Sequence, residues 1–321
     1  MRGRALSVLL LAGSLGCASE PGAPVDAALP AIDAASADAG RDAARIDAAR
    51  SDAGAAYGPA MRLGALPSVL PETSGLVASR AHAGVLWAEN DSGNPPNAFA
   101  VDETGALLAT ITLTGATNVD WEDIALAPGA SGDDLYLADV GDNAARTSGG
   151  TSGRASIRLY RLAEPDPSLG DQSLAAEAIE LRYPAAPHDC EAVFVDPTTG
   201  DAWLVTKEDT GLAHVMVARA PLSTSAPTTL EDVGTLDLVL ATAADVRRDR
   251  SAVVVRGYGE VRVYDVVGGD FVAALGSPTW TRAPSGAPAE AIAFASNDRD
   301  LFTAPEGALA GLFRIPAPAT P

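Results

Sequence analysis

The sequence predicts an all-β domain folded as a five-bladed β-propeller. In its clearest repeat, residues 121–143, Glu122 and Asp123 open a short apolar run, a turn containing Gly and Pro follows, and a second apolar run ends in a polar loop. Two short β-runs around such a turn indicate a hairpin. The pattern recurs with openings at Glu72, Glu122, Glu191, Asp245 and Glu290, although Glu72 is one residue out of step, with Thr73 at the aligned position, and the copy at Asp245 is degraded. Strand-based self-similarity at this period is typical of propeller blades.

Further strand-like runs follow each hairpin and complete the blades. They cover residues 98–102 and 107–113, 157–162 and 178–183, 214–218 and 233–240, 261–267 and 271–275, and finally 312–315. The last unit is one strand short, whereas the run 61–66 at the front is left over. Because a terminal strand commonly completes the final blade and removes its exposed edge, we expect 61–66 to close the propeller. A sixth blade within 143–189 and a large β-sandwich are the alternatives, but a sandwich does not explain the acid-opened repeat.

The N-terminal residues 1–17 have the features of a signal peptide. Arg2 and Arg4 precede an apolar segment and then a stretch of small residues that ends at Cys17. This ending resembles the lipobox of bacterial lipoproteins, in which the cysteine becomes the lipidated N-terminus, although Ser14 stands where leucine is commonest. The alternative is ordinary cleavage near Ala18 or Ala23, which would give a secreted protein.

Residues 18–58 are dominated by alanine and aspartate. Such a segment cannot bury enough apolar surface to offset its ordering entropy, so we expect a disordered tether. The chain is thus divided into a signal peptide (1–17), a tether (18–58) and a propeller domain (59–321). With Cys17 as anchor, the predicted location is the bacterial cell envelope, in the outer membrane or periplasm.

The predicted domain is strongly acidic. Residues 59–321 hold 35 of the 42 acidic and 17 of the 22 basic residues, a net charge of −18. Nucleic acid is therefore excluded as a partner, because phosphate binding needs a basic face, and the membrane is reached only through the lipid anchor. If Cys17 carries lipid, Cys190 has no disulfide partner and is expected as a small buried side chain. We expect a monomer.

The propeller geometry predicts where polar residues gather. Antiparallel neighbours place the start of the first strand of a blade beside the end of the second. The opening acids, Glu122, Glu191, Glu290, Glu72 and Asp245, should therefore converge at one end of the central axis. The closing loops should surround them with Asn90, Asp91, Asp139, Asp142, Asn143, Lys207, Arg256 and Glu306. Carboxylates packed around one axis repel one another, and hard oxygen ligands of this kind suit calcium.

Each of these residues also has a purely structural interpretation. The opening acids could cap strands and bind channel water, and Lys207 with Arg256 could neutralise the acidic ring. The sequence has no HExxH motif, no His pair at ligand spacing and no GxSxG nucleophile motif, which argues against zinc or serine-hydrolase chemistry. His188 and Asp189, beside Glu191, are the only candidates for a catalytic base at the rim.

The ordered set of motifs resembles a family of secreted bacterial β-propeller proteins of largely uncharacterised function. The motifs are ExSGL at 72–76, NDSG at 90–93, DWED at 120–123, LYLADVGDN at 135–143, EAVFVDP to VTK at 191–207, and EAIAF to EG at 290–307. At the level of the fold, the chain is distantly similar to calcium-dependent propellers such as gluconolactonases and propeller phytases. That similarity implies a calcium site but says little about chemistry.

Two classes of function are compatible with the sequence. The first is an envelope-anchored binding module that presents the acidic channel face, with calcium, to a small ligand, a glycan or an envelope protein. The second is a calcium-dependent hydrolase of a lactone, ester or phosphoester. The sequence favours binding, because it shows many acids but no distinct nucleophile.

Overall fold

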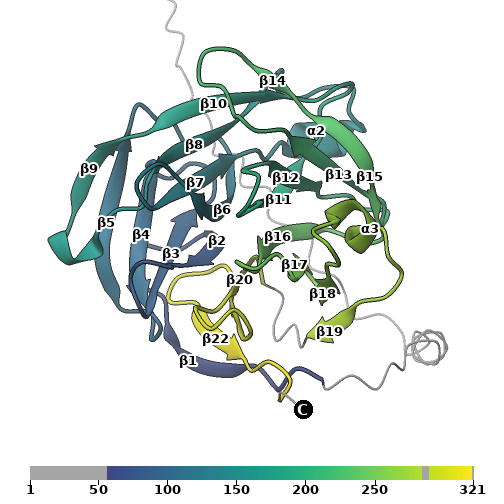
Figure 1. Ribbon diagram of the computed structural model, residues 1–321. Coiled ribbons are helices and arrows are strands. Elements are labelled where there is room, and N and C mark those ends of the chain that lie inside the picture. Colours follow the sequence, from purple (N-terminus) through teal and green to yellow (C-terminus); the bar gives the residue numbers. More distant parts are fainter. Residues whose placement is uncertain (1–55, 284–288, 320–321) are drawn as a thin grey trace, which may run out of the picture. The chain divides into compact units, whose positions relative to one another are not determined.

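The computed structural model describes residues 56–283 and 289–319, all within one unit of the chain, Gly54–Pro321. Five β-sheets are arranged around a central axis as the blades of a propeller (Figure 1). The inner strands of blades 1 to 5 are β2 (Thr73–Ala78), β6 (Trp121–Pro128), β11 (Cys190–Val195), β16 (Ala241–Val246) and β20 (Ala291–Phe294). Each inner strand contacts the next, and β20 contacts β2, so the described strands form a closed ring.

The remaining strands continue outward from the inner ones in antiparallel order. Blade 1 adds β3 (Val85–Asn90), β4 (Asn97–Asp102) and β5 (Leu107–Thr114); blade 2 adds β7 (Asp133–Asp139), β8 (Ile157–Ala163) and β10 (Glu177–Arg182). Blade 3 adds β12 (Ala202–Thr206), β13 (Ala213–Ala218) and β15 (Glu231–Leu236); blade 4 adds β17 (Ala252–Gly257), β18 (Val261–Asp265) and β19 (Thr281–Ala283). Blade 5 adds β21 (Leu301–Ala304), β22 (Gly311–Ile315) and β1 (Met61–Ala65).

The predicted closure by the N-terminal strand is confirmed. Strand β1 pairs antiparallel with β22, with Met61 opposite Arg314 and Ala65 opposite Gly311 (Figure 1). The first strand of the domain thus completes its last blade and covers the edge that β22 would otherwise expose. This pairing joins the two ends of the domain.

The core lies between the blades. Successive side chains of a strand point to opposite faces, and here both faces are covered. In β6, Ile124 packs into the cluster shared with blade 1, whereas Ala125 packs into the cluster shared with blade 3. In β17, Val253 and Val254 divide in the same way between blades 3 and 5. Burial on both faces explains why these strands are almost continuously apolar.

Two sequence predictions need correction. The run 271–275, predicted as the outer strand of blade 4, is the helix α3 (Phe271–Leu275), and β19 takes the strand position. Asp270 caps this helix by accepting a hydrogen bond from the Ala273 N–H, which favours helix over strand. The insert 143–189 holds no sixth blade: it supplies α2 (Asn143–Ser148), the 3₁₀ helix η2 (Pro167–Leu169), β8 and β10 of blade 2, and β9 (Gln172–Ala175).

Two short strands extend blades 1 and 2 beyond the antiparallel set. Strand β9 runs parallel to β5, and β14 (Thr228–Thr229), which comes from blade 3, runs parallel to β10. Both add a neighbour to an outer edge strand. No described helix is long and apolar enough to cross a membrane. The predicted signal peptide, Cys17 and almost all of the predicted tether lie outside the described residues.

Candidate functional site

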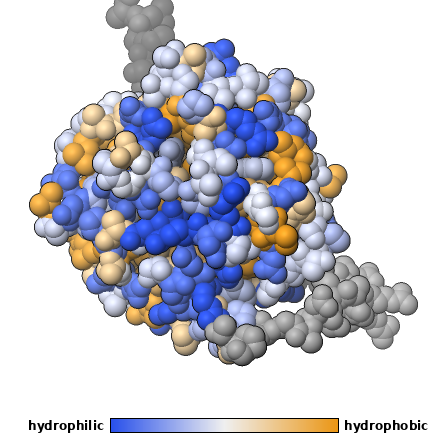
Figure 2. Space-filling view, in the orientation of Figure 1, coloured by the Kyte–Doolittle hydropathy of each residue, from blue (hydrophilic) through white to orange (hydrophobic). Residues whose placement is uncertain are grey.

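The inner strands begin, and the second strands end, at one end of the propeller axis. In the registers, Thr73 lies opposite Asn90, Trp121 opposite Asp139, and Cys190 opposite Thr206. We call this end the acidic mouth and define it by Asp91, Asp120, Glu122, Glu191, Lys207, Tyr258, Glu290 and Glu306. Figure 2 shows hydrophilic side chains gathered around the centre of the face that it presents.

β-Bulges direct side chains of the inner strands into the acidic mouth. The ladder register shifts between Trp121 and Asp123, so Glu122 is the extra residue of β6. The same irregularity makes Glu191 the extra residue of β11. A bulge re-aims the side chain that it carries and is common beside functional sites. Glu290 directly precedes β20, where its N–H bonds the Ala304 carbonyl at 3.3 Å.

The register identifies different equivalents of these acids in the other two blades. In β16 the bulge residue is Thr242, between Ala241 and Ala243. In β2 the irregularity spans Ser74 and Gly75. Glu72 and Asp245 therefore do not occupy the equivalent positions, and blades 1 and 4 have the hydroxyl residues Ser74 and Thr242 where the other three blades have glutamate.

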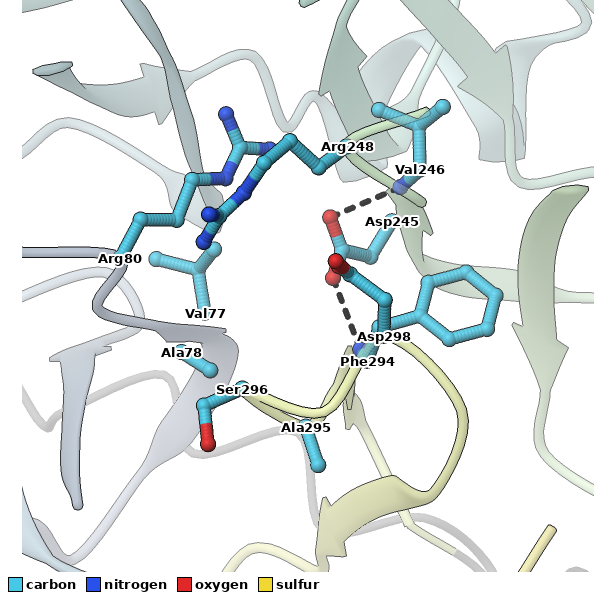
Figure 3. A pocket seen from close by; sticks show the side chains of 10 residues that line it. All are labelled: Val77, Ala78, Arg80, Asp245, Val246, Arg248, Phe294, Ala295, Ser296 and Asp298. Carbon is cyan, nitrogen blue, oxygen red and sulfur yellow. Dashed lines mark hydrogen bonds between the residues drawn. The ribbon is translucent and has the colours of Figure 1, made fainter. Parts of the chain in front are cut away.

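Asp245, predicted as a member of the acidic ring, lies toward the other end of the inner strands. Its carboxylate accepts hydrogen bonds from the backbone N–H groups of Val246, at 2.7 Å, and Phe294, at 2.8 Å (Figure 3). It lines a pocket there with the side chains of Arg80 and Arg248. Asp245 lies three residues beyond Thr242, and three residues along a strand cover about 10 Å, so its carboxylate does not reach the acidic mouth.

Glu72 lies at the rim and not in the ring. Its side chain is exposed, and its Oε2 accepts a hydrogen bond from Asn94 at 2.5 Å. Asn90 has a structural role, since its amide bonds the Val69 carbonyl and the Glu72 N–H at 2.8 and 3.1 Å. Of this group only Asp91 faces the other acids of the mouth.

One part of the mouth is neutralised by Lys207. Its Nζ lies 2.5 Å from Glu191 Oε2 and 3.3 Å from the Tyr258 hydroxyl, and the residue is 7 % exposed. Burial disfavours the ammonium charge, but Glu191 and Glu290 outweigh it and raise the pKa of Lys207. Burial also raises the pKa of Glu290, and both Lys207 and a hydrogen bond from Tyr258 oppose that rise. The lysine therefore forms an internal ion pair with Glu191, and its charge also opposes the rise in the pKa of Glu290.

A second part of the mouth consists of three carboxylates. Asp91, Asp120 and Glu122 each place one oxygen within 4.8 Å of the others. Burial raises the pKa of Asp120 to about 7, with a further contribution from the charge of Asp91. Burial and the charges of Glu191 and Asp91 hold the pKa of Glu122 well above its usual range. These oxygens have the chemistry and spacing of a site for a hard divalent cation.

Two neighbours support this carboxylate trio, which we define as Asp91, Asp120 and Glu122. The hydroxyl of Ser74, the bulge residue of β2, donates to Glu122 Oε2 at 3.1 Å. A Cβ on Gly141 would lie 2.3 Å from Glu122 Oε1 and 2.7 Å from Asp120 Oδ2. Only glycine allows the backbone to come so close to both acids. Sequence reasoning missed Ser74, Asp120 and Gly141 as site residues, although DWED and DVGDN contain the last two.

The other predicted contacts in blades 2 and 3 form a supporting network. Asp139 pairs with Arg154 at 2.8 Å. Asp142 caps α2 through the Ala145 N–H at 3.0 Å. Asp189, 1 % exposed, accepts the Asp142 N–H at 2.6 Å and pairs with Arg146.

Arg146 also donates to Asn143, so each of these side chains already has a protein partner. Asp189 is therefore not placed as a catalytic base, and its predicted companion His188 lies beside Glu208, outside the mouth.

Arg256 is fully buried between blades 4 and 5. Its guanidinium donates to the Ala289 carbonyl at 2.7 Å and to the Thr303 hydroxyl at 2.9 Å. Burial lowers its pKa to about 10, and the charge of Glu290 opposes the change. Its predicted role as a ligand contact is therefore replaced by a structural one. Glu306 is exposed at the rim, where desolvation and the charge of Glu290 raise its pKa to about 7.

Asp123 joins the inner strands at the propeller axis. Its Oδ2 accepts hydrogen bonds from the N–H groups of Val193 in β11, at 2.8 Å, and Ala244 in β16, at 3.0 Å. The residue is fully buried, and burial raises its pKa well above the usual range. The adjacent acids of DWED thus divide their roles, with Glu122 facing the mouth and Asp123 joining three blades.

Comparison with models of known protein families found no match, and comparison with functionally characterised proteins found none either. The resemblance to secreted propellers therefore remains a prediction, and the functional argument rests on the geometry of the mouth.

Proposed function

We propose that the protein is a binding module whose acidic mouth holds a calcium ion on Asp91, Asp120 and Glu122. The observation that carries this proposal is the division of charge within the mouth. Lys207 forms an ion pair with Glu191, whereas none of the ion pairs among the described residues involves the carboxylate trio, whose three oxygens converge. Burial is the main cause of the raised pKa values of Asp120 and Glu122, and repulsion between neighbouring carboxylates adds to it. A divalent cation would remove this repulsion.

The number of protein ligands indicates how a partner would bind. Calcium takes six to eight oxygens, so three carboxylates leave several positions for other oxygen ligands. We infer that a small ligand, a glycan or an envelope protein supplies them through hydroxyl or carboxylate oxygens. Such partially satisfied sites on extracellular modules bind calcium with dissociation constants of roughly 10⁻⁴ to 10⁻³ M.

The test is calcium titration of the full-length chain followed by thermal denaturation. At a hundredfold excess over its dissociation constant, calcium should stabilise the folded state by about 2.7 kcal/mol, and Glu122→Gln should remove most of this effect. Asp265→Asn is the matched control, because it removes one exposed carboxylate at the end of β18. A melting temperature indifferent to calcium would contradict the proposal.

The hydrolase alternative has one observation in its favour. Asp120, whose pKa is about 7, is suited to proton transfer at neutral pH. Turnover of a lactone, ester or phosphoester that disappears with chelator and in Asp120→Asn would establish it. Calcium binding without turnover of any of these substrates would exclude the hydrolase and support the binding module.

We also propose that lipid on Cys17 anchors the propeller in the bacterial cell envelope. The basis is the sequence alone, since Cys17 follows a signal-like segment. Labelling with a fatty-acid analogue should mark the protein, and Cys17→Ala should release it into the soluble fraction. Equal labelling of both forms would exclude the anchor.

A further inference from the structure

Two of the three histidines of the chain meet on blade 3, outside the acidic mouth. His188 lies just before β11, Glu208 just after β12, and His214 near the start of β13. Since β11, β12 and β13 are antiparallel neighbours, these three positions fall at the same end of the blade. The two histidines are separated by 25 residues in the sequence, so only the fold brings them together.

The three side chains present donor atoms to a common point. One nitrogen from each histidine and one Glu208 oxygen all lie within 4.8 Å of one another. His188 Nδ1 is 3.3 Å from Glu208 Oε1, and the two imidazole centroids are 4.7 Å apart. Zinc bonds of about 2.0–2.2 Å in a tetrahedral site separate ligand atoms by roughly 3.3 Å, so small side-chain rotations would complete the geometry.

Neighbouring groups fix the orientation of these ligands. His214 Nδ1 lies 2.8 Å from Asp232 Oδ2. A carboxylate that accepts the Nδ1 proton leaves the Nε2 lone pair for a metal, which is the usual outer arrangement of metal-binding histidines. The Thr206 hydroxyl donates to Glu208 Oε1 at 3.0 Å, and the ring of Tyr183 packs edge-on against His188. Two of these neighbours lie in strands, Thr206 in β12 and Asp232 in β15, so the sheet itself helps to hold the cluster.

We propose that His188, Glu208 and His214 form a zinc site, with Asp232 as the outer partner of His214. Two imidazoles and one carboxylate are the ligand set of open zinc centres, in which a fourth position takes water or another ligand. The side chains of His188, Glu208 and His214 are 20, 27 and 34 % exposed, so solvent reaches the site. The mixed nitrogen and oxygen donors distinguish it from the all-oxygen trio of the acidic mouth. The proposed zinc site is independent of the function proposed for the acidic mouth.

The test uses the full-length chain without a polyhistidine tag, stripped of metal with chelator. Zinc chloride is titrated in competition with a chromophoric chelator, and cobalt(II) is used to record the visible spectrum of a four-coordinate site. We expect one zinc per chain, a loss of at least a hundredfold in affinity in His188→Ala and His214→Ala, and a 10- to 100-fold loss in Asp232→Asn. His82→Ala, in the turn between β2 and β3, is the matched control and should bind normally.

Two results would overturn the proposal. The first is unchanged zinc stoichiometry and affinity in the double variant His188→Ala/His214→Ala. The second is a loss of zinc in Glu122→Gln as large as the loss in the histidine variants, which would tie zinc binding to the acidic mouth. Melting curves of the metal-free variants verify folding, and Glu208→Gln with Asp232→Asn tests the same site with nearly isosteric changes if a histidine variant fails to fold.

Discussion

Replacing Asp120 by asparagine should stabilise the calcium-free protein at pH 8 and weaken its response to calcium. Burial, with the charges of Asp91 and Asp189, raises the pKa of Asp120 from 3.8 to about 7. Between these pH values the folded state holds a proton that the unfolded chain has lost. Rising pH therefore removes stability across this window, which is the reverse of the behaviour of an ion-paired carboxylate. Asparagine has no proton to lose, so the variant lacks this contribution.

The size of the effect follows from the pKa. Each pH unit within the window corresponds to about 1.4 kcal/mol, so the interval from pH 5 to pH 7 corresponds to about 2.7 kcal/mol. Asp120 is half-buried, and solvent screening reduces this figure. We expect the calcium-free wild type to lose about 1 to 2 kcal/mol over the interval through this carboxyl. Calcium competes with the proton, so its stabilising effect should be larger at pH 8 than at pH 5.

The assay is urea denaturation followed by circular dichroism at pH 5 and pH 8, with chelator or with calcium. Asp120→Asn should show the smaller pH dependence and the smaller calcium effect, whereas Asp265→Asn should behave as the wild type. If the calcium-free wild type is equally stable at both pH values, or if the two variants respond alike, the assignment of Asp120 to a cation site is refuted.

Three further predictions concern the frame of the site. Lys207→Met should lower the free energy of unfolding by about 3–5 kcal/mol, because it leaves Glu191 buried without its partner. The double variant with Glu191→Gln should recover part of this loss, and a loss below about 1 kcal/mol in the single variant would contradict the ion pair. Asp123→Ala should cost about 3 kcal/mol or more in chemical denaturation, since it leaves three backbone N–H groups without an acceptor, and a neutral effect would be inconsistent with its role. Deleting residues 59–66 should cause aggregation, measured by light scattering, or lower the free energy of unfolding by several kcal/mol, measured by melting. Deleting residues 18–53 should change neither, and equal behaviour of the two deletions would refute closure by β1.

The sequence was sufficient to predict the architecture because the blade pattern is local. Strands buried on both faces give apolar runs such as 253–255, and the turns between them recur at a readable period. The surplus run at the front and the strand missing at the end predicted the pairing of β1 with β22. The exception is 271–275, where the cap formed by Asp270 favoured a helix that an apolar run alone does not reveal.

The site was predicted less completely, because its members depend on register. Glu122, Glu191 and Glu290 were recognised, but a bulge decides that Thr242 and not Asp245 is their equivalent. Arg256 was expected to contact a ligand, but it is buried between two blades, where it bonds a carbonyl and a hydroxyl. The pair of His188 and His214 is invisible to motif spacing, since only strand pairing brings these residues together.

The most direct test of a cation in the acidic mouth is anomalous diffraction from crystals grown with calcium, recorded at a long wavelength. We predict an anomalous peak among the carboxylates of Asp91, Asp120 and Glu122, with further density from ligands on its open side. The same crystals of Glu122→Gln should lack the peak. A mouth with no anomalous peak in the wild type, in which Lys207 alone neutralises the surrounding acids, would contradict the account.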